Sequence, residues 1–223
     1  MPEQLGFKLP SVPALGRADF LVAPSNAVAV AMIEGDADKL VLTGPDGAGK
    51  THLAHVWASR RRAQIVAATE VCAWDVPALA QGAVAVEDVP DIATDEEAQK
   101  ALFHLHNLVL AEGHALLLTG RGRVRDWGIT LPDLASRIAA APAAALKPPD
   151  DTLLAAVLAK LFADRQLTPK PDLIPYLIRR MDRSFAAARD LVARLDAASL
   201  AQKRPLSRAL AGRVLDNEDP AAR

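Results

Sequence analysis

The chain has one cysteine, no marked excess of charge of either sign and no long run of apolar residues. The single cysteine, Cys72, excludes an internal disulfide bond and fits a reducing cytoplasm. No stretch reaches the roughly 18 uninterrupted apolar residues that a membrane-spanning helix needs, and residues 1–10 lack the apolar segment of a signal peptide. A net charge of −1 gives no overall electrostatic indication of nucleic-acid binding. We therefore expect a cytoplasmic protein without membrane contact.

What is present is the composition of a folded protein. Apolar residues make up 51% of the chain and charged residues 24%, which excludes a disordered polymer. Short apolar runs alternate with helical patterns, which predicts an α/β fold with a parallel sheet covered on both faces. The five predicted strands are residues 39–43, 64–67, 83–87, 115–119 and 143–146.

The pattern changes at Lys147-Pro-Pro-Asp150, after which no strand is predicted. The helical segments that follow are residues 151–164, 171–181, 185–202 and 207–215. We therefore expect a small all-helical domain behind the α/β domain. The predicted divisions are an irregular tail at 1–19, the α/β domain at 20–148, the helical domain at 149–216 and a second tail at 217–223.

Residues 44–51 read Gly-Pro-Asp-Gly-Ala-Gly-Lys-Thr, the pattern of a phosphate-binding loop between a strand and a helix. The glycines let backbone N–H groups turn toward phosphate oxygens at the positive end of the following helix. The lysine is expected to neutralise the β- and γ-phosphates, and the threonine to ligate Mg²⁺. The alternative is a glycine-rich turn without a ligand, which so many motif residues in register disfavour. The predicted nucleotide-binding residues are Gly44, Pro45, Asp46, Gly47, Ala48, Gly49, Lys50 and Thr51.

A second acidic site ends the predicted strand at 83–87. Glu87 and Asp88 follow its apolar residues, and after a phosphate loop such a pair is typical of a Mg²⁺ ligand and a water-orienting acid. Glu87 stands at the metal-side position, where aspartate is usual. We therefore expect the chain to bind a nucleotide but to hydrolyse it weakly.

Four segments are similar to motifs of one protein family. They are residues 20–26 (Phe-Leu-Val-Ala-Pro-Ser-Asn), 49–53 (Gly-Lys-Thr-His-Leu), 131–137 (Leu-Pro-Asp-Leu-Ala-Ser-Arg) and 181–184 (Met-Asp-Arg-Ser). Together they resemble the AAA+ core of DnaA-related proteins, and most of all the short Hda-type (HdaA) members. The resemblance spans about residues 1–216. It implies a P-loop AAA+ domain at 20–148 and a helical lid at 149–216, with no room left for the DNA-binding domain of DnaA.

The resemblance implies roles for individual residues. Arg137 matches an arginine finger that acts in trans on a neighbouring subunit's nucleotide, and the alternative is a surface arginine in a weak salt bridge. His52 belongs to the family's extended phosphate-loop motif, and Thr119 is the candidate first sensor.

Three positions depart from the family pattern. Arg121 stands where these proteins usually carry an acid, and Ala186 stands near the position of the second-sensor arginine. Arg183 and Arg189 flank that position, and Arg183 is the candidate substitute. Missing sensors and Glu87 together indicate weak intrinsic ATP hydrolysis. Because the implied activity promotes hydrolysis on another protein, the word enzyme applies only loosely.

The N-terminal tail also resembles a family motif. Gln4, Leu5, Phe7 and Leu9 match the short peptide by which Hda-type proteins dock on the sliding clamp. An extended peptide can bury the three apolar side chains in pockets while the glutamine amide makes a fixed hydrogen bond. The alternative is a frayed terminus that folds back on the core.

The resemblance as a whole implies a cytoplasmic, nucleoid-associated bacterial regulator with bound ADP or ATP and Mg²⁺. Its expected partners are DnaA and the sliding clamp (the beta subunit of DNA polymerase III), with DNA reached indirectly through the clamp. It would stimulate hydrolysis of DnaA-bound ATP in trans and so inactivate the initiator. Two alternatives remain open: an autonomous AAA+ ATPase or helicase loader, and a truncated DnaA-like DNA-binding protein. The resting nucleotide and self-association are open as well.

Overall fold

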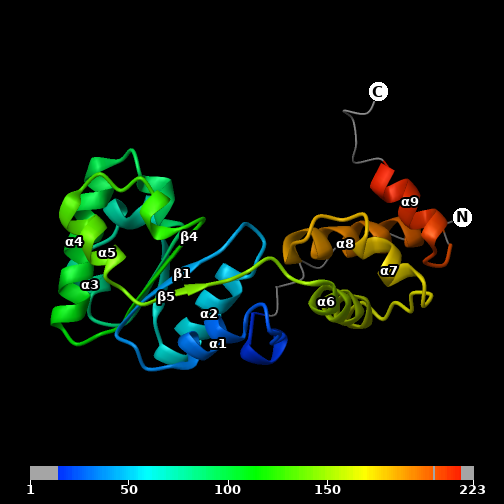
Figure 1. Ribbon diagram of the computed structural model, residues 1–223, viewed down its shortest axis with the longest axis horizontal. Helices are drawn as coiled ribbons and strands as arrows, with labels where there is room; N and C mark the ends of the chain where they lie inside the picture. The colour runs from blue at the N-terminus through cyan, green and yellow to red at the C-terminus, as the bar shows by residue number, and fades with distance from the viewer. Residues whose placement is uncertain (1–14, 203, 217–223) are drawn as a thin grey trace, which may run out of the picture.

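A computed structural model describes residues 15–202 and 204–216 (Figure 1). An α/β part comes first along the chain and a helical part follows, joined by the extended segment after the last strand. The predicted clamp-binding residues Gln4, Leu5, Phe7 and Leu9 lie outside the described residues, so their role stays a prediction.

The sheet has five parallel strands in the order β2-β3-β4-β1-β5. This arrangement confirms the predicted α/β fold. The strands are β1 (Lys39–Thr43), β2 (Gln64–Ala67), β3 (Val84–Glu87), β4 (Leu116–Gly120) and β5 (Ala143–Ala145). Because β4 lies between β1 and β3, the loop after β1 and the acids that end β3 come to one edge of the sheet.

Strand residues point alternately to two apolar layers. Val41 of β1 belongs to one core cluster, while Leu40 and Leu42 belong to the other. On the first face pack α3 (Val76–Leu79), α4 (Glu96–Ala111) and α5 (Pro132–Ala139). On the second face pack α1 (Ala27–Glu34) and α2 (Lys50–Arg61). Short 3-10 helices lie in the connections, namely η2 (Ala68–Ala73), η3 (Val89–Ile92) and η4 (Val124–Asp126).

The helical part has its own core. Its helices are α6 (Asp151–Asp164), α7 (Leu173–Ile178), α8 (Phe185–Gln202) and α9 (Arg208–Asp216). Phe162, Leu177 and Leu195 are buried among them. Helix α7 is shorter than predicted, because the N–H groups of Arg180 and Met181 both bond the Leu177 carbonyl in a closing turn. In the part of the chain that the structure describes, none of the helices is long and apolar enough to cross a membrane.

The prediction of an irregular tail at 1–19 is wrong for residues 17–19, which form the 3-10 helix η1 (Arg17–Asp19). This 3-10 turn is fixed by contacts that lie far away in the sequence. Arg17 pairs with Glu34 of α1, and His52 Nε2 of α2 lies 3.0 Å from the Gly16 carbonyl oxygen. Local sequence carries little sign of such contacts. The other domain limits stay predictions.

Candidate functional site

The phosphate loop runs from the end of β1 to the beginning of α2. Gly47 and Gly49 have φ angles of +69° and +99°, which side chains rarely adopt. Helix α2 begins at Lys50, and the N–H groups of its first turn have no partner within the helix. The loop therefore has the backbone form and the positive helix end that phosphate binding requires.

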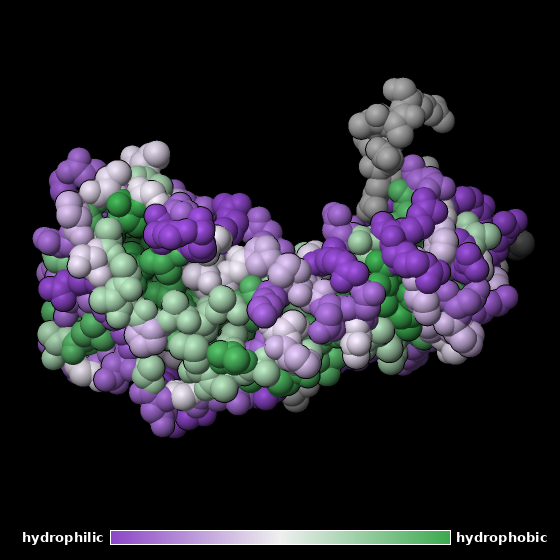
Figure 2. All heavy atoms as spheres, viewed as in Figure 1, coloured by the Kyte–Doolittle hydropathy of each residue, from purple (hydrophilic) through white to green (hydrophobic). Residues whose placement is uncertain are grey.

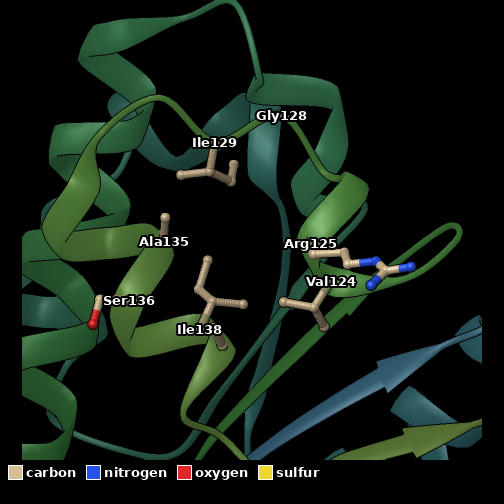
Figure 3. A pocket seen from close by; sticks show the side chains of 8 residues that line it. Val124, Arg125, Gly128, Ile129, Ala135, Ser136 and Ile138 are labelled. Atoms are coloured by element: carbon tan, nitrogen blue, oxygen red, sulfur yellow. The ribbon is translucent and has the colours of Figure 1, made fainter.

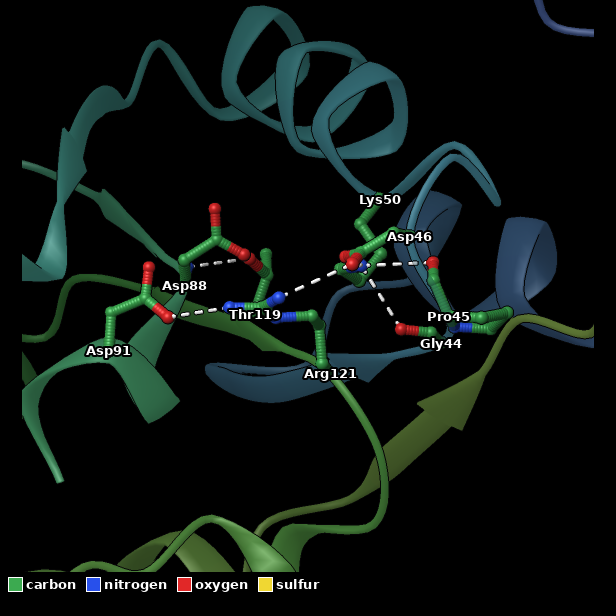
Figure 4. Close-up of polar contacts among 8 residues, drawn as sticks. All are labelled: Gly44, Pro45, Asp46, Lys50, Asp88, Asp91, Thr119 and Arg121. Carbon is green, nitrogen blue, oxygen red and sulfur yellow. Dashed lines mark hydrogen bonds and ion pairs between the residues drawn. The ribbon is translucent and has the colours of Figure 1, made fainter. Parts of the chain in front are cut away.

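Lys50 occupies the centre of this loop. Its side chain is only 8% exposed, and its Nζ donates to the carbonyl oxygens of Gly44 at 3.0 Å and Pro45 at 3.1 Å. Asp46 Oδ1 lies 3.8 Å from the same nitrogen (Figure 4). A positive charge is thus held where a phosphate chain would pass.

Glu87, the last residue of β3, faces Thr51 at the start of α2. Burial raises the pKa of the Glu87 carboxyl, and a hydrogen bond with Thr51 partly offsets this shift. Glu87 Oε1 is buried and has no hydrogen-bond partner among the described residues. These oxygens suit a hard cation such as Mg²⁺, with phosphate and water as its other ligands. Among the described residues no group of three or more His, Cys, Asp or Glu is arranged so that it could hold a metal ion, and the Mg²⁺ site stays a prediction.

We expect Glu87→Gln to raise the thermal midpoint of the nucleotide-free protein by about 2–4 °C at pH 8. The folded pKa of Glu87 lies above its unfolded value, so the folded state binds the extra proton and loses stability as pH rises through the folded pKa. Glutamine cannot ionise, and the gain should therefore shrink as pH falls toward 4.5. Thermal scans across this pH range, with the exposed Glu70→Gln as control, measure the effect. An equal gain at every pH would contradict it.

Asp88 and Thr119 join the ends of β3 and β4. The Asp88 N–H donates to Thr119 Oγ1 at 3.2 Å, and the Thr119 side chain is fully buried. Asp88 has a φ of +54°, a left-handed conformation that aspartate tolerates better than most residues. The structure therefore brings the predicted first sensor to the predicted water-orienting acid.

The start of α8 covers the phosphate loop. The Phe185 N–H donates to the Gly47 carbonyl oxygen at 2.8 Å, and a Cβ added at Gly47 would meet the Ser184 Cβ at 2.5 Å. Phe185 and Phe20 both lie against Gly49. The loop glycines thus serve a second purpose, because they let the lid approach closely. Sequence patterns alone did not predict this contact.

Two predicted nucleotide-binding residues make other contacts. The Arg183 guanidinium pairs with Asp151 of α6 at 2.6 Å, both side chains being exposed. The His52 ring contacts Phe20 edge to face, with the ring centres 5.1 Å apart. The structure does not bring these two side chains to Lys50, and their nucleotide roles stay predictions.

Arg137 lies exposed near the end of α5. Its guanidinium carbon is 5.5 Å from the centre of the Phe103 ring, and its carbonyl oxygen accepts a hydrogen bond from Lys39 Nζ at 2.9 Å. Lys39 also lies 3.4 Å from the buried His106, whose pKa is lowered by burial, so the neutral ring can accept from the ammonium group. Lys39 is the first residue of β1, whereas the phosphate loop follows the last. Arg137 is therefore at the opposite end of this strand, about 13 Å long, from its own phosphate loop.

A residue outside the predicted motifs connects η3, which follows the acids of β3, to the start of α5. Gln99 of α4 is fully buried, and its Nε2 donates to the carbonyl oxygens of Ile92 at 3.1 Å and Ala93 at 2.9 Å. Its Oε1 accepts from the N–H groups of Thr130 at 3.0 Å and Leu131 at 2.9 Å. The available signal was a polar residue on the apolar face of a predicted helix.

A separate hollow of about 320 Å³ lies between η4 and α5 (Figure 3). The walls of this hollow are mainly apolar. The α/β part also shows a broad apolar area on the face in Figure 2. The hollow is lined by Val124, Arg125, Gly128, Ile129, Ala135, Ser136, Ile138 and Ala139. No residue of the phosphate loop lines it, so it is distinct from the site around Lys50.

The strand order and the loop after β1 give the chain the α/β fold seen in AAA+ proteins, and the solved structures with similar folds include replication initiators. Domain III of the initiator DnaA from Thermotoga maritima has a TM-score of 0.81 at 17% identity, covering 94% of this chain and 98% of that one. AMPPCP-bound DnaA from Aquifex aeolicus has a TM-score of 0.72 at 16% identity, covering 86% of this chain and 69% of that one. The Thermotoga maritima Holliday junction branch migration motor RuvB has a TM-score of 0.64 at 16% identity, covering 85% of this chain and 64% of that one. No family model matches the chain.

Proposed function

We propose that this chain binds ADP or ATP in the loop around Lys50. Lys50 and the α2 N-terminus provide the positive charge, and Thr51 and Glu87 offer oxygen ligands for Mg²⁺, which would shield the phosphate charge. Phe185 closes the loop from the lid side. The similar fold of a DnaA solved with AMPPCP supports the assignment of an adenine nucleotide.

We further propose that the chain is a regulator of replication initiation of the Hda type. It docks on the DNA-loaded sliding clamp through Gln4, Leu5, Phe7 and Leu9 and acts on ATP held by DnaA. The observation that carries this proposal is the placement of Arg137. An exposed guanidinium at the far end of β1 from its own loop cannot reach its own nucleotide, but it is free to enter the site of another molecule.

The chemistry expected of Arg137 is electrostatic. Its planar guanidinium presents a fork of N–H donors to the charge that develops on the transferred phosphoryl group of the partner's ATP. Phe103 and the Lys39 bond fix the end of α5 and so reduce the freedom that the side chain loses on docking. Its own turnover is expected to be weak, because the Glu87 pKa is raised and Ala186 replaces a cation beside Gly47.

The test combines purified chain, DNA-loaded clamp and DnaA carrying radiolabelled ATP. Hydrolysis should accelerate only when the chain and the loaded clamp are both present. Rapid ATP turnover by the chain alone would instead identify an autonomous ATPase or loader. Salt-dependent DNA binding without the clamp would identify an initiator-like DNA-binding protein.

Deletion of residues 4–9 should abolish retention of the chain on clamp-loaded DNA while nucleotide binding is unchanged. The reason is that the proposed peptide carries all the clamp contacts and the phosphate loop lies elsewhere. Co-sedimentation with clamp-loaded DNA measures retention, and calorimetry with ADP measures nucleotide binding. The matched control replaces only Lys8 by alanine, which should leave retention intact. Full retention of the deletion variant would disprove the role of the tail.

A further inference from the structure

Arg121 leaves the sheet beside the beginning of the phosphate loop. It follows Gly120, the last residue of β4, and Gly120 is paired in register with Thr43, the last residue of β1. The loop begins at the next residue, Gly44. An arginine at the position where the resemblance predicts an acid is thus placed at the mouth of the site.

The Asp46 carboxylate lies between two cations. Arg121 Nη1 is 3.3 Å from Asp46 Oδ2, and Lys50 Nζ is 3.8 Å from Asp46 Oδ1. The second nitrogen of the fork, Arg121 Nη2, is 3.0 Å from Asp91 Oδ1, beyond the acids that end β3 (Figure 4). An anion held jointly by the loop lysine and a guanidinium has the surroundings that a bound phosphate would have.

The Asp46 carboxylate can move away from the two cations at little cost in free energy. Its side chain is 73% exposed, so its carboxylate can turn into water when negative phosphates approach. A phosphate group carries more charge and more acceptor oxygens than a carboxylate, and it fits the planar fork of an arginine. Asp91 lies outside the loop and can keep hold of Nη2 while Nη1 changes partner.

We propose that Arg121 binds the terminal phosphate of ATP in this chain's own site and so distinguishes ATP from ADP. This inference rests on the proposed nucleotide binding. The N–H groups of the loop hold the inner phosphates, Lys50 reaches the β- and γ-phosphates, and the acids of β3 face the terminal one. Arg121 emerges from β4, which lies between β1 and β3, and so it stands at the terminal position.

The helical part offers weaker candidates than Arg121 for binding the terminal phosphate. Beside Gly47 the lid presents Ala186, whose Cβ would lie 3.4 Å from a Cβ added at that glycine. The neighbouring Arg183 is paired with Asp151. Within the described part of the chain, Lys50 and Arg121 are the cations that ion pairs join to the phosphate loop.

The test is calorimetric titration of the full chain with MgADP and with MgAMPPCP, an ATP analogue whose methylene bridge between the β- and γ-phosphates resists hydrolysis. Arg121→Ala should weaken AMPPCP binding about 10- to 100-fold and change ADP binding less than about twofold. Arg121→Lys keeps the charge without the fork and should give an intermediate loss. Asp46→Asn removes the competing carboxylate and should strengthen AMPPCP binding more than ADP binding. The control Arg123→Ala removes an arginine that pairs with Asp126 and should change neither affinity.

Other outcomes overturn the inference. An equal loss for both nucleotides in Arg121→Ala would mean that the arginine only supports the loop, and unchanged affinities would mean that it touches neither ligand. Weaker AMPPCP binding in Asp46→Asn would show that Asp46 does not stand in for a phosphate. If the wild-type chain binds neither nucleotide, the proposed function itself fails, and this result differs from any selective effect of Arg121.

Discussion

Arg137→Ala is expected to remove nearly all of the proposed stimulation of DnaA-bound ATP hydrolysis, a loss on the order of 10³-fold. An arginine finger raises the rate of phosphoryl transfer by about 10³–10⁵, because its donors meet charge that is absent from the ground state. Binding of this chain's own nucleotide should stay unchanged, because Lys39, which bonds the Arg137 carbonyl, lies at the opposite end of β1 from the loop. Single-turnover hydrolysis with saturating chain and clamp measures the effect.

Two further variants separate the finger from general charge. Arg137→Lys keeps a positive charge but lacks the fork, so most of the stimulation should still be lost. Arg125→Ala removes another exposed arginine from the neighbouring η4 and should retain it. Equal stimulation by the wild type and Arg137→Ala would show that Arg137 is a surface arginine and not a finger.

Gln99→Leu is expected to lower the free energy of unfolding by about 3–5 kcal/mol, because each buried polar group left unpaired costs about 1–3 kcal/mol. The leucine would be close in size to glutamine, but it would leave the Ala93 carbonyl oxygen and the N–H groups of Thr130 and Leu131 without their partner. The Ile92 carbonyl oxygen would keep its bond from the Asp95 N–H. Urea unfolding followed by circular dichroism measures the loss.

Gln81→Leu is the matched control for this change. Gln81 is exposed and makes one long hydrogen bond to the Pro77 carbonyl oxygen, so its replacement should alter stability by less than about 0.5 kcal/mol. A Gln99→Leu protein as stable as this control would show that the three backbone groups find other partners. It would also remove the case for Gln99 as the link between η3 and the start of α5.

The strands and the phosphate loop were predictable because their signals are local. Each apolar run is bounded by turn residues, and the loop motif specifies its own backbone shape through Gly47 and Gly49. The predicted strands match the observed ones to within one or two residues at their ends. The short helix α3 and the 3-10 turns were not predicted, because segments of three to six residues carry little periodicity.

The site residues also divide into those that local motifs predict and those whose contacts depend on long-range pairing. The presence of Lys50, Thr51, Glu87 and Asp88 was evident from motif spacing, and the parallel sheet brings them to one edge. The partners of Arg121 were not evident, because Asp46 and Asp91 are distant in sequence and meet it only where β1, β3 and β4 end together. Long-range pairing of this kind leaves no period or motif in the chain.

The sequence by itself determined that this protein is an α/β P-loop chain with a helical second part, since composition, periodicity and one eight-residue motif act locally. Only the tertiary structure decided which charges share the phosphate site and which arginine faces outward. Arg121 meets Asp46 because β4 is inserted between β1 and β3, and Arg137 is held at the far end of β1 by Lys39. The physical reason is that strand order, which depends on how whole layers pack, places side chains that sequence spacing keeps apart.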